Sequence, residues 1–534
     1  MKRRLFALAL ALLLAVSLPV SALAGEWFID DGDIIISATE NGQTVKQGDK
    51  DAVEDAAPVI KQRESSTSTD RVIKVIAEED ATANVTLDGV NIDTSKTTSV
   101  IGRGQAALRT EGDGDVNIEL DGDNYLKSSF ASHAAGLNKG NSGTLTINDE
   151  DNNGKLEATG GYGGAGIGGG QHSSASDITI TGGTITARGS NNGAGIGGGA
   201  SDINGPYCNG SNITISGGDV TAIGSVYASG IGGGSIGSGS DITISGGKVT
   251  AKGGDQGGAG IGGGFWASGS DITISGGEVE ATGGGLAAGI GGGNGGNGTD
   301  IEISGGKVTA KGGMSGAGIG GGCRGTGSSI TISGDAQVKA QGGTEYNENE
   351  EGAGAGIGNG GTSFEDEYEN DILVDGAEVE PDTSGLTENG RLEYYAPGAD
   401  MENDAPKKVI ENKPETEPEP SGDHAQPGAP APVYSVTDKG GNAVSYTAAR
   451  EGGVLTIRVD AAYARLTLTA DEAQALTAQG VEKVVFITTG ATSAFRPADL
   501  TAYKDEAPFV LTHDGETVTF TAGETDLASL LLQA

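Results

Sequence analysis

The chain has 534 residues, 98 of them glycine, and a formal net charge of −40. A chain this acidic is repelled by nucleic acid phosphates and by anionic membrane surfaces, which argues against both as partners. Two cysteines are too few for a disulfide-dense secreted scaffold, so a hydrophobic core must provide the stability.

The N-terminus has the pattern of a secretory signal peptide. A basic start, Lys2 to Arg4, precedes an apolar run and the small-residue cleavage signature Ala22-Leu23-Ala24. Residues 1–24 are therefore predicted to be a signal peptide. We expect a secreted or extracellular protein that could associate with the cell surface, with no integral membrane segment in the mature chain.

Residues 25–71 are irregular and are predicted to form an N-terminal cap. Strand-like segments begin near Val72, and from residue 143 to 376 one phrase, G-A-G-I-G-G-G followed by S-D-I-T-I-S-G-G, recurs. Its isoleucines are Ile167, Ile196, Ile231, Ile261, Ile290, Ile319 and Ile357, with spacings of 29, 35, 30, 29, 29 and 38 residues. A near-constant period of this length predicts a solenoid, here over residues 72–403.

Each copy contains three short period-2 segments separated by glycine. In one copy the inward residues are predicted to be Ile272, Ile274, Val279, Ala281 and Ile290, and the outward ones Thr273, Glu278, Glu280 and Thr282. No segment between strands is suited to a crossover helix. The coils must therefore stack about 4.8 Å apart as an all-β, parallel β-helix.

The glycine phrases do not have the pattern of nucleotide-binding loops, because no helix and no Lys-Ser/Thr ending follows them. Narrow corners explain them better. A second column precedes the I-T-I strand and contains Asp177, Asn212, Asp241, Asp271, Asp300, Ser329 and Asp371. A calcium ladder is one interpretation, but Asn and Ser favour hydrogen-bonded capping of the corners.

Two segments and the repeat resemble a known family. N-V-T-L-D-G-V-N-I-D at 84–93, V-N-I-E-L-D-G-D-N-Y-L at 116–126 and the G-A-G-I-G-G-G copies are similar to secreted bacterial carbohydrate-binding domain-containing proteins. The resemblance covers about residues 27–380. It implies a right-handed β-helix of pectate-lyase-like architecture and a polysaccharide partner, and acidic polysaccharides are among the candidates.

No catalytic set can be assembled from the repeat. A polysaccharide lyase or hydrolase needs clustered carboxylates with a basic partner, yet His133 and His172 belong to different coils and the arginines are scattered. We therefore expect a non-catalytic protein. An enzyme remains an alternative because a fold does not determine a function.

One segment has part of a calcium-loop pattern. Asp149, Asp151 and Asn153, followed by Gly154, match the first half of a D-x-D-x-N-G loop, so calcium is the cofactor that these residues would select. Gly160 stands where the closing carboxylate belongs. An Asx-rich turn is the alternative interpretation.

Aromatic residues after the G-I-G-G phrase are the candidate ligand-binding residues. Tyr207, the pair Phe265 and Trp266, and the pair Phe364 and Tyr368 should lie at one corner of the solenoid, where aromatic faces can stack on sugar rings. We expect one residue of the pair Phe265 and Trp266 to fill the core and Trp266 to be the exposed one.

Two further expectations test the register. Cys208 and Cys323 belong to coils four apart, about 19 Å along the axis, and should therefore be thiols. Successive coils should also bring together residues of alternating charge, Asp219, Lys248, Glu278 and Lys307.

After the repeat, residues 404–432 are rich in Pro and Glu and are predicted to be a linker. Residues 433–534 should form a small α+β domain with helices at 471–479 and 526–533, and this domain could contact the cell envelope. The alternative to polysaccharide binding is a structural or adhesive surface protein that binds a protein partner and presents an uncovered strand edge.

Overall fold

The computed structural model describes residues 25–96, 106–202, 205–345, 352–365, 371–387 and 389–411, and residues 434–532 apart from 440–443, 445, 452, 460, 479, 501–502, 504–507, 516 and 524. The predicted signal peptide lies outside the described residues. The chain divides into two compact units, Met1–Thr416 and Glu417–Ala534, which are described separately.

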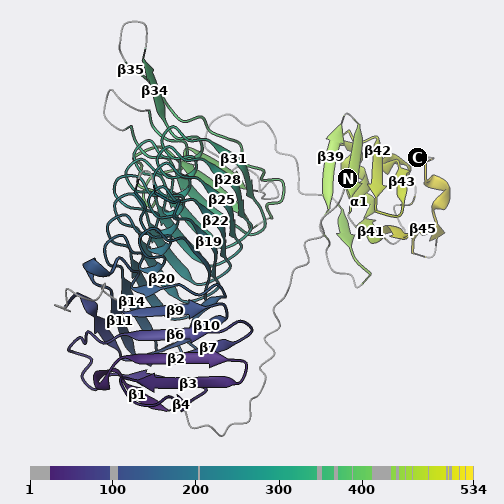
Figure 1. Cartoon of the computed structure of the whole chain (residues 1–534). Coiled ribbons are helices and arrows are strands. Elements are labelled where there is room, and N and C mark those ends of the chain that lie inside the picture. Colours follow the sequence, from purple (N-terminus) through teal and green to yellow (C-terminus); the bar gives the residue numbers. More distant parts are fainter. Residues whose placement is uncertain are drawn as a thin grey trace. The chain divides into compact units, whose positions relative to one another are not determined.

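The first unit is a solenoid with three faces, each a sheet of stacked strands (Figure 1). The first sheet contains β1 (Glu26–Phe28), β5 (Val59–Lys61), β7 (Thr82–Asp88), β10 (Asp115–Asp121), β13 (Leu145–Asn148), β16 (Ala175–Ile180), β19 (Gly210–Ile215), β22 (Gly239–Ile244), β25 (Gly269–Ile274), β28 (Gly298–Ile303) and β31 (Gly327–Ile332).

The second sheet contains β8 (Asn91–Asp93), β11 (Asp123–Lys127), β14 (Lys155–Thr159), β17 (Thr184–Arg188), β20 (Asp219–Ile223), β23 (Lys248–Lys252), β26 (Glu278–Thr282), β29 (Lys307–Lys311), β32 (Gln337–Gln341), β36 (Arg391–Tyr395) and β37 (Lys408–Glu411). The third contains β4 (Val53–Glu54), β3 (Gly42–Gln47), β2 (Ile34–Thr39), β6 (Ile73–Ala77), β9 (Leu108–Gly112), β12 (Leu137–Asn138), β15 (Ile167–Gly168), β18 (Ile196–Gly197), β21 (Ile231–Gly232), β24 (Ile261–Gly262), β27 (Ile290–Gly291), β30 (Ile319–Gly320) and β33 (Ile357–Gly358). Short 3-10 turns, η1 (Ile29–Asp31), η2 (Thr94–Lys96) and η3 (Phe130–Ser132), join some strands.

The predicted parallel β-helix is confirmed. Strands of consecutive coils pair in parallel with repeat residues in register, for example Ile272 with Ile301 in the first sheet and Ile261 with Ile290 in the third. The residues predicted to point inward in this coil are all buried. A continuous core of Ile, Val, Leu and Ala side chains follows from this alternation and runs along the solenoid.

The predicted charge column is confirmed as well. Asp219 pairs with Lys248, Lys248 with Glu278, and Glu278 with Lys307 in successive strands of the second sheet. Lys307 Nζ lies 2.9 Å from Glu278 Oε1. Residues of opposite charge therefore face each other on neighbouring rungs.

Glycine is required where backbone stacks directly on backbone. A Cβ placed at Gly264 would lie 1.9 Å from the carbonyl oxygen of Gly234, and one at Gly293 would lie 1.9 Å from that of Gly264. These glycines occupy the same position in consecutive coils. The recurrent phrase is therefore explained by close stacking of the coils as well as by tight corners.

The segment predicted as a cap already belongs to the sheets. β1 and β5 join the first sheet in parallel, and β2 pairs in parallel with β6. The solenoid strands therefore begin at Glu26 rather than near residue 72. The hairpin of β2 with β3, extended by β4, is antiparallel and covers the first coil.

The C-terminal end of the solenoid differs from the sequence expectation. Asp371 was expected to begin another I-T-I strand, but β35 (Asp371–Val374) forms an antiparallel hairpin with β34 (Thr362–Glu365). Segment 376–411 covers the last coil: Ile332 N–H donates to Asp382 O at 2.8 Å, and β37 pairs antiparallel with β36. β37 occupies residues that the sequence assigned to the linker.

The second unit has two small sheets and little helix. Its strands are β38 (Ser435–Thr437), β39 (Thr447–Glu451), β40 (Val454–Arg458), β41 (Tyr463–Leu468), β42 (Lys483–Ile487), β43 (Thr492–Phe495), β44 (Phe509–Asp514), β45 (Thr517–Ala522) and β46 (Thr525–Asp526). Helix α1 (Ala470–Ala478) agrees with the prediction, and Thr469 and Glu472 cap it reciprocally. α2 (Pro497–Leu500) was not predicted.

The helix expected at 526–533 is wrong. Asp526 ends β46, and its carboxylate accepts a bond from Ala528 N–H, which opens only the short 3-10 turn η5 (Ala528–Leu530). Within the described ranges, no helix combines the length and apolar character needed to cross a membrane. Both cysteines, Cys208 and Cys323, are buried thiols that lie four coils apart, as predicted.

Candidate ligand-binding edge

In most coils from β15 to β30, two turns flank the two-residue strand of the third sheet. We call the turn before this strand the entry turn and the turn after it the exit turn. For β24 these are residues 255–257 and 265–266. Ala259 N–H donates to Gly263 O at 2.9 Å, and Ala288 N–H makes the same bond to Gly292 O in the next coil. The A-G-I-G-G phrase is thereby closed into a compact loop.

Hydrogen bonds join the exit turn of one coil to the entry turn of the preceding coil. Phe265 N–H donates to Tyr227 O at 2.8 Å, and Asn294 N–H donates to Gly257 O at 2.9 Å. The two series of turns therefore form one continuous ridge. We call it the turn ridge: entry turns 162–163, 191–192, 226–227, 255–257, 285–286 and 314–315, and exit turns 171–172, 235–236, 265–266, 294–295 and 323–324.

Aromatic side chains cluster on this ridge. The rings of Phe265 and Trp266 stack with centroids 4.7 Å apart, and Phe265 also contacts Tyr227 at 4.9 Å. Trp266 is 60% exposed and Phe265 is half-buried. The expectation that one of the pair would fill the core is wrong, because Phe265 packs on Tyr227 at the surface instead.

The position of Trp266 depends on a neighbouring glycine. Trp266 has a left-handed backbone, with φ of 58°, and its N–H donates to Asn294 O in the next coil at 2.7 Å. A Cβ at Gly295 would lie 2.7 Å from Trp266 Cδ1. The indole ring therefore lies against Gly295, where a larger residue would displace it.

The other predicted aromatics have different outcomes. Tyr207 is 73% exposed in the connection between β18 and β19, two coils from Trp266, and its carbonyl accepts a bond from Ser174 Oγ. Phe364 is part of strand β34 in the hairpin, so it is not in a turn of the stacked coils. Tyr368 lies outside the described residues.

Three aromatic residues near this edge were not predicted from the sequence. Tyr162 lies in an entry turn, and Phe130, 67% exposed, contacts it edge to face at 4.6 Å. Tyr227 lies in a later entry turn. The entry turns follow the second strand of each coil, whereas the predicted aromatics all follow the G-I-G-G phrase.

The predicted metal loop is held as a turn. Asp149 is buried, and its carboxylate accepts bonds from the backbone N–H of Asn153 at 3.1 Å and of Gly154 at 3.0 Å. Asn153 donates to Asp151 at 2.7 Å. These contacts are those of the Asx-rich turn, the alternative interpretation.

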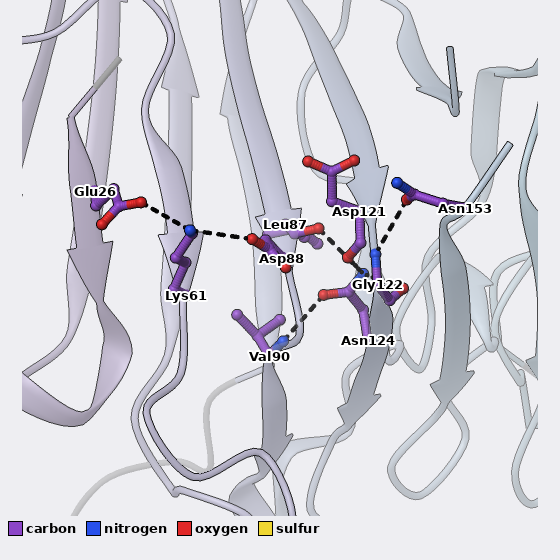
Figure 2. A network of polar contacts seen from close by, with 9 residues as sticks. All are labelled: Glu26, Lys61, Leu87, Asp88, Val90, Asp121, Gly122, Asn124 and Asn153. Atoms are coloured by element: carbon purple, nitrogen blue, oxygen red, sulfur yellow. Dashed lines mark hydrogen bonds and ion pairs between the residues drawn. The ribbon is translucent and has the colours of Figure 1, made fainter. Parts of the chain in front are cut away.

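A different trio of carboxylates converges beside it. Ligand oxygens of Glu119, Asp121 and Asp151 lie within 4.8 Å of one another, and these residues could hold a cation. Burial, followed by repulsion from Asp151 and Asp88, raises the pKa of Asp121. Figure 2 shows Asp88 and Asp121 on neighbouring rungs, with Lys61 bridging Asp88 and Glu26.

The column before the I-T-I strands has a conformational explanation. Asp241, Asp271 and Asp300 have φ of 52°, 52° and 53°, and the register skips them, so each is a left-handed bulge in its strand. Asp, Asn and Ser tolerate this conformation better than bulky residues do. The described side-chain contact within the column is Asn212 Nδ2 donating to Asp177 Oδ1, rather than the corner capping that was expected. Asp371, in the hairpin, is not a member.

The two histidines of the solenoid lie on the turns. His133 packs against Tyr162 at 5.4 Å, and His172 Nε2 is 3.6 Å from the Asp202 carboxylate, both side chains of that pair being exposed. The contact between His172 and Asp202 is therefore exposed to solvent.

Comparison with known proteins supports the architecture. Seven segments, 152–171, 178–200, 213–235, 242–265, 272–294, 301–323 and 330–361, match the family model described as Beta helix repeat. No curated protein and no solved structure matched the chain. The matched segments follow the coils from β14 to β33, and their stacked parallel strands make this chain a β-helix repeat protein.

Proposed function

We propose that this chain is a secreted, non-catalytic polysaccharide-binding protein that holds its ligand along the turn ridge. The observation that carries the proposal is the exposed aromatic group of Trp266 with Phe265 and Tyr227, two coils from exposed Tyr207. Aromatic faces stack on the apolar faces of sugar rings while the hydroxyls stay in water.

The alternative function, adhesion through an uncovered strand edge, has less support. At one end of the solenoid the hairpin of β2 with β3 extends the third sheet, and the terminal strands β1 and β4 have only three and two residues. Residues 376–411 cover the other end. Very short edge strands and a covered end oppose edge-to-edge assembly. A protein partner is therefore the second candidate and becomes an outcome of the test.

The test is affinity electrophoresis in gels that contain neutral or acidic polysaccharides. Trp266→Ala and Tyr207→Ala should each weaken retention on the best ligand, by about tenfold for a stacked aromatic of this kind. Tyr125→Ala is the matched control, because Tyr125 lies under Lys155 on the second sheet, away from the turn ridge.

Circular dichroism must show that each variant keeps the parent's spectrum. Retention of Trp266→Ala and Tyr207→Ala equal to that of the parent would remove the turn ridge and the neighbouring Tyr207 as the binding site. Failure of the parent to bind any polysaccharide, with or without calcium, would refute the function itself and leave a protein partner as the alternative.

A further inference from the structure

A row of cations follows the outer face of the second sheet. Every second coil places a basic residue at the last, exposed position of its strand: Lys127 in β11, Arg188 in β17, Lys252 in β23 and Lys311 in β29. The register is continuous, since Thr159, Ile223 and Thr282 pair with the row members on either side of them. We call these four residues the basic row.

The spacing of the basic row is set by the stacking of the coils. Two rungs of about 4.8 Å place successive cations about 9.6 Å apart along the axis, close to the length of two sugar units. The intervening positions, Thr159, Ile223 and Thr282, are uncharged. The row therefore offers one positive charge per two sugars to a chain that lies parallel to the axis.

A depression separates two members of the row. A cavity of about 420 Å³ is lined by Arg188 and Lys252, with Ile223 and Val226 among its other residues. Val226 belongs to the entry turn that also contains Tyr227, so the basic row lies beside the turn ridge at this depression. Cationic and aromatic groups therefore border one strip of surface.

The row has two carboxylate partners of different exposure. Lys252 Nζ lies 3.8 Å from Asp255 Oδ1, and both of these side chains are exposed, although Asp255 also lines the depression. Water screens an exposed pair of this kind, so an anionic ligand can replace Asp255. Lys127 Nζ lies 3.3 Å from Asp93 Oδ2, whose side chain is only 16% exposed, so Lys127 keeps its partner. Lys311 also lies near Asp400, whose pKa is lowered chiefly by bonds from Asn403 and Glu402 and in part by this lysine.

We propose that the basic row binds a linear acidic polysaccharide that carries one carboxylate or sulfate per disaccharide. This inference rests on the proposed function and names its ligand class and a second line of contacts. The anionic groups would pair with Arg188, Lys252 and Lys311, while sugar rings face the turn ridge. A neutral glycan would use only the aromatic contacts.

The test compares two double variants of the full chain that change the charge equally. Arg188→Gln/Lys252→Gln removes the cations that line the depression, and Lys248→Gln/Lys307→Gln removes two from the opposite ends of strands in the same sheet. The probes are hyaluronan, which has one carboxylate per disaccharide, the neutral polymer xylan, and single-stranded DNA as an unrelated polyanion. An ionic strength of about 0.15 M limits long-range repulsion from the acidic chain.

The row variant should bind hyaluronan about tenfold more weakly than the parent, and the control variant within about twofold of it. Binding of xylan by the row variant should equal that by the parent. Equal loss of hyaluronan binding in both variants would overturn the role of the basic row. So would a parent that binds xylan or DNA as tightly as hyaluronan. In either case, a parent that binds polysaccharide keeps the proposed function. A parent that binds no polysaccharide, here or in the affinity gels, overturns both proposals.

Discussion

His513 makes the second unit sensitive to acid. Its side chain is buried in β44, with Nδ1 3.0 Å from Thr488 Oγ1 and Nε2 2.9 Å from Ser493 Oγ. Its ring also contacts Phe486. Burial lowers the pKa of His513 from 6.5 to about 4. The folded unit therefore holds a neutral imidazole that the unfolded chain protonates first.

The sign and size of the effect follow from proton linkage. Because the folded pKa is lowered, the stabilising contribution is complete above pH 6.5, declines as the pH falls below it, and is lost by about pH 4. At about 1.4 kcal/mol per pH unit, the free energy of unfolding should fall by about 2 kcal/mol between pH 7.5 and 5. Most carboxylates remain ionised in that range.

The assay must report on the second unit of the full chain. Both tryptophans, Trp27 and Trp266, belong to the solenoid, so their fluorescence does not follow it. Hydrogen exchange of peptides from β42 and β44, corrected for intrinsic rates, gives local stability at each pH. His513→Gln should remove the pH dependence, although it lowers stability at pH 7.5.

Two results would refute this reasoning. Parallel pH profiles for the parent and His513→Gln would show that another group titrates. A proton resonance of His513 that titrates near pH 6.5 would show that its ring is solvated when the unit is folded, against the burial and the two hydroxyl contacts described here.

Two further predictions concern charge in the solenoid. Glu278→Lys places a third cation between Lys248 and Lys307. The melting temperature at low salt should therefore fall by on the order of 1 °C and recover in about 1 M salt. No change at low salt would show that the charge column does not stabilise the solenoid. Asp121→Asn should raise the free energy of unfolding at neutral pH by about 0.5 kcal/mol, because it removes the burial of a charged carboxylate and its repulsion from Asp151, as checked by thermal unfolding. Because the folded pKa of Asp121 is raised, the ionised carboxylate lowers the free energy of unfolding fully above that pKa and not at all once the pH has fallen well below it. In acid, the side chain at this position is uncharged in both the parent and the variant, so a stability gain of the variant that persists there would contradict this explanation.

The repeat made the solenoid predictable because every coil carries the same alternation. Ile272 and Ile274 alternate with polar residues, and the buried positions follow directly. The failures lie where the period is interrupted. Asp371 begins a segment that resembles D-I-T-I, yet it follows an insertion and pairs antiparallel within a hairpin. Local resemblance to the repeat could not show which strand was its partner.

The basic row was hidden for a related reason. Insertions make the sequence separations of Lys127, Arg188, Lys252 and Lys311 unequal, so no fixed period connects them. Only the strand register shows that each lies two rungs from the next. The left-handed bulges at Asp241 and Asp271 were equally hidden, because the sequence shows a preference for Asx residues without showing which backbone conformation it serves.

The candidate site and the solenoid share one physical cause. Glycines such as Gly264 and Gly293 allow successive loops to stack with backbone against backbone, and this contact brings each exit turn onto the preceding entry turn. Only small side chains, such as those of Ser235, Ser315 and Cys323, are buried in the ridge, and large ones can be added only on its outside. Trp266, which lies against Gly295, is such an addition, so the ligand surface can vary between coils while the stacking stays constant.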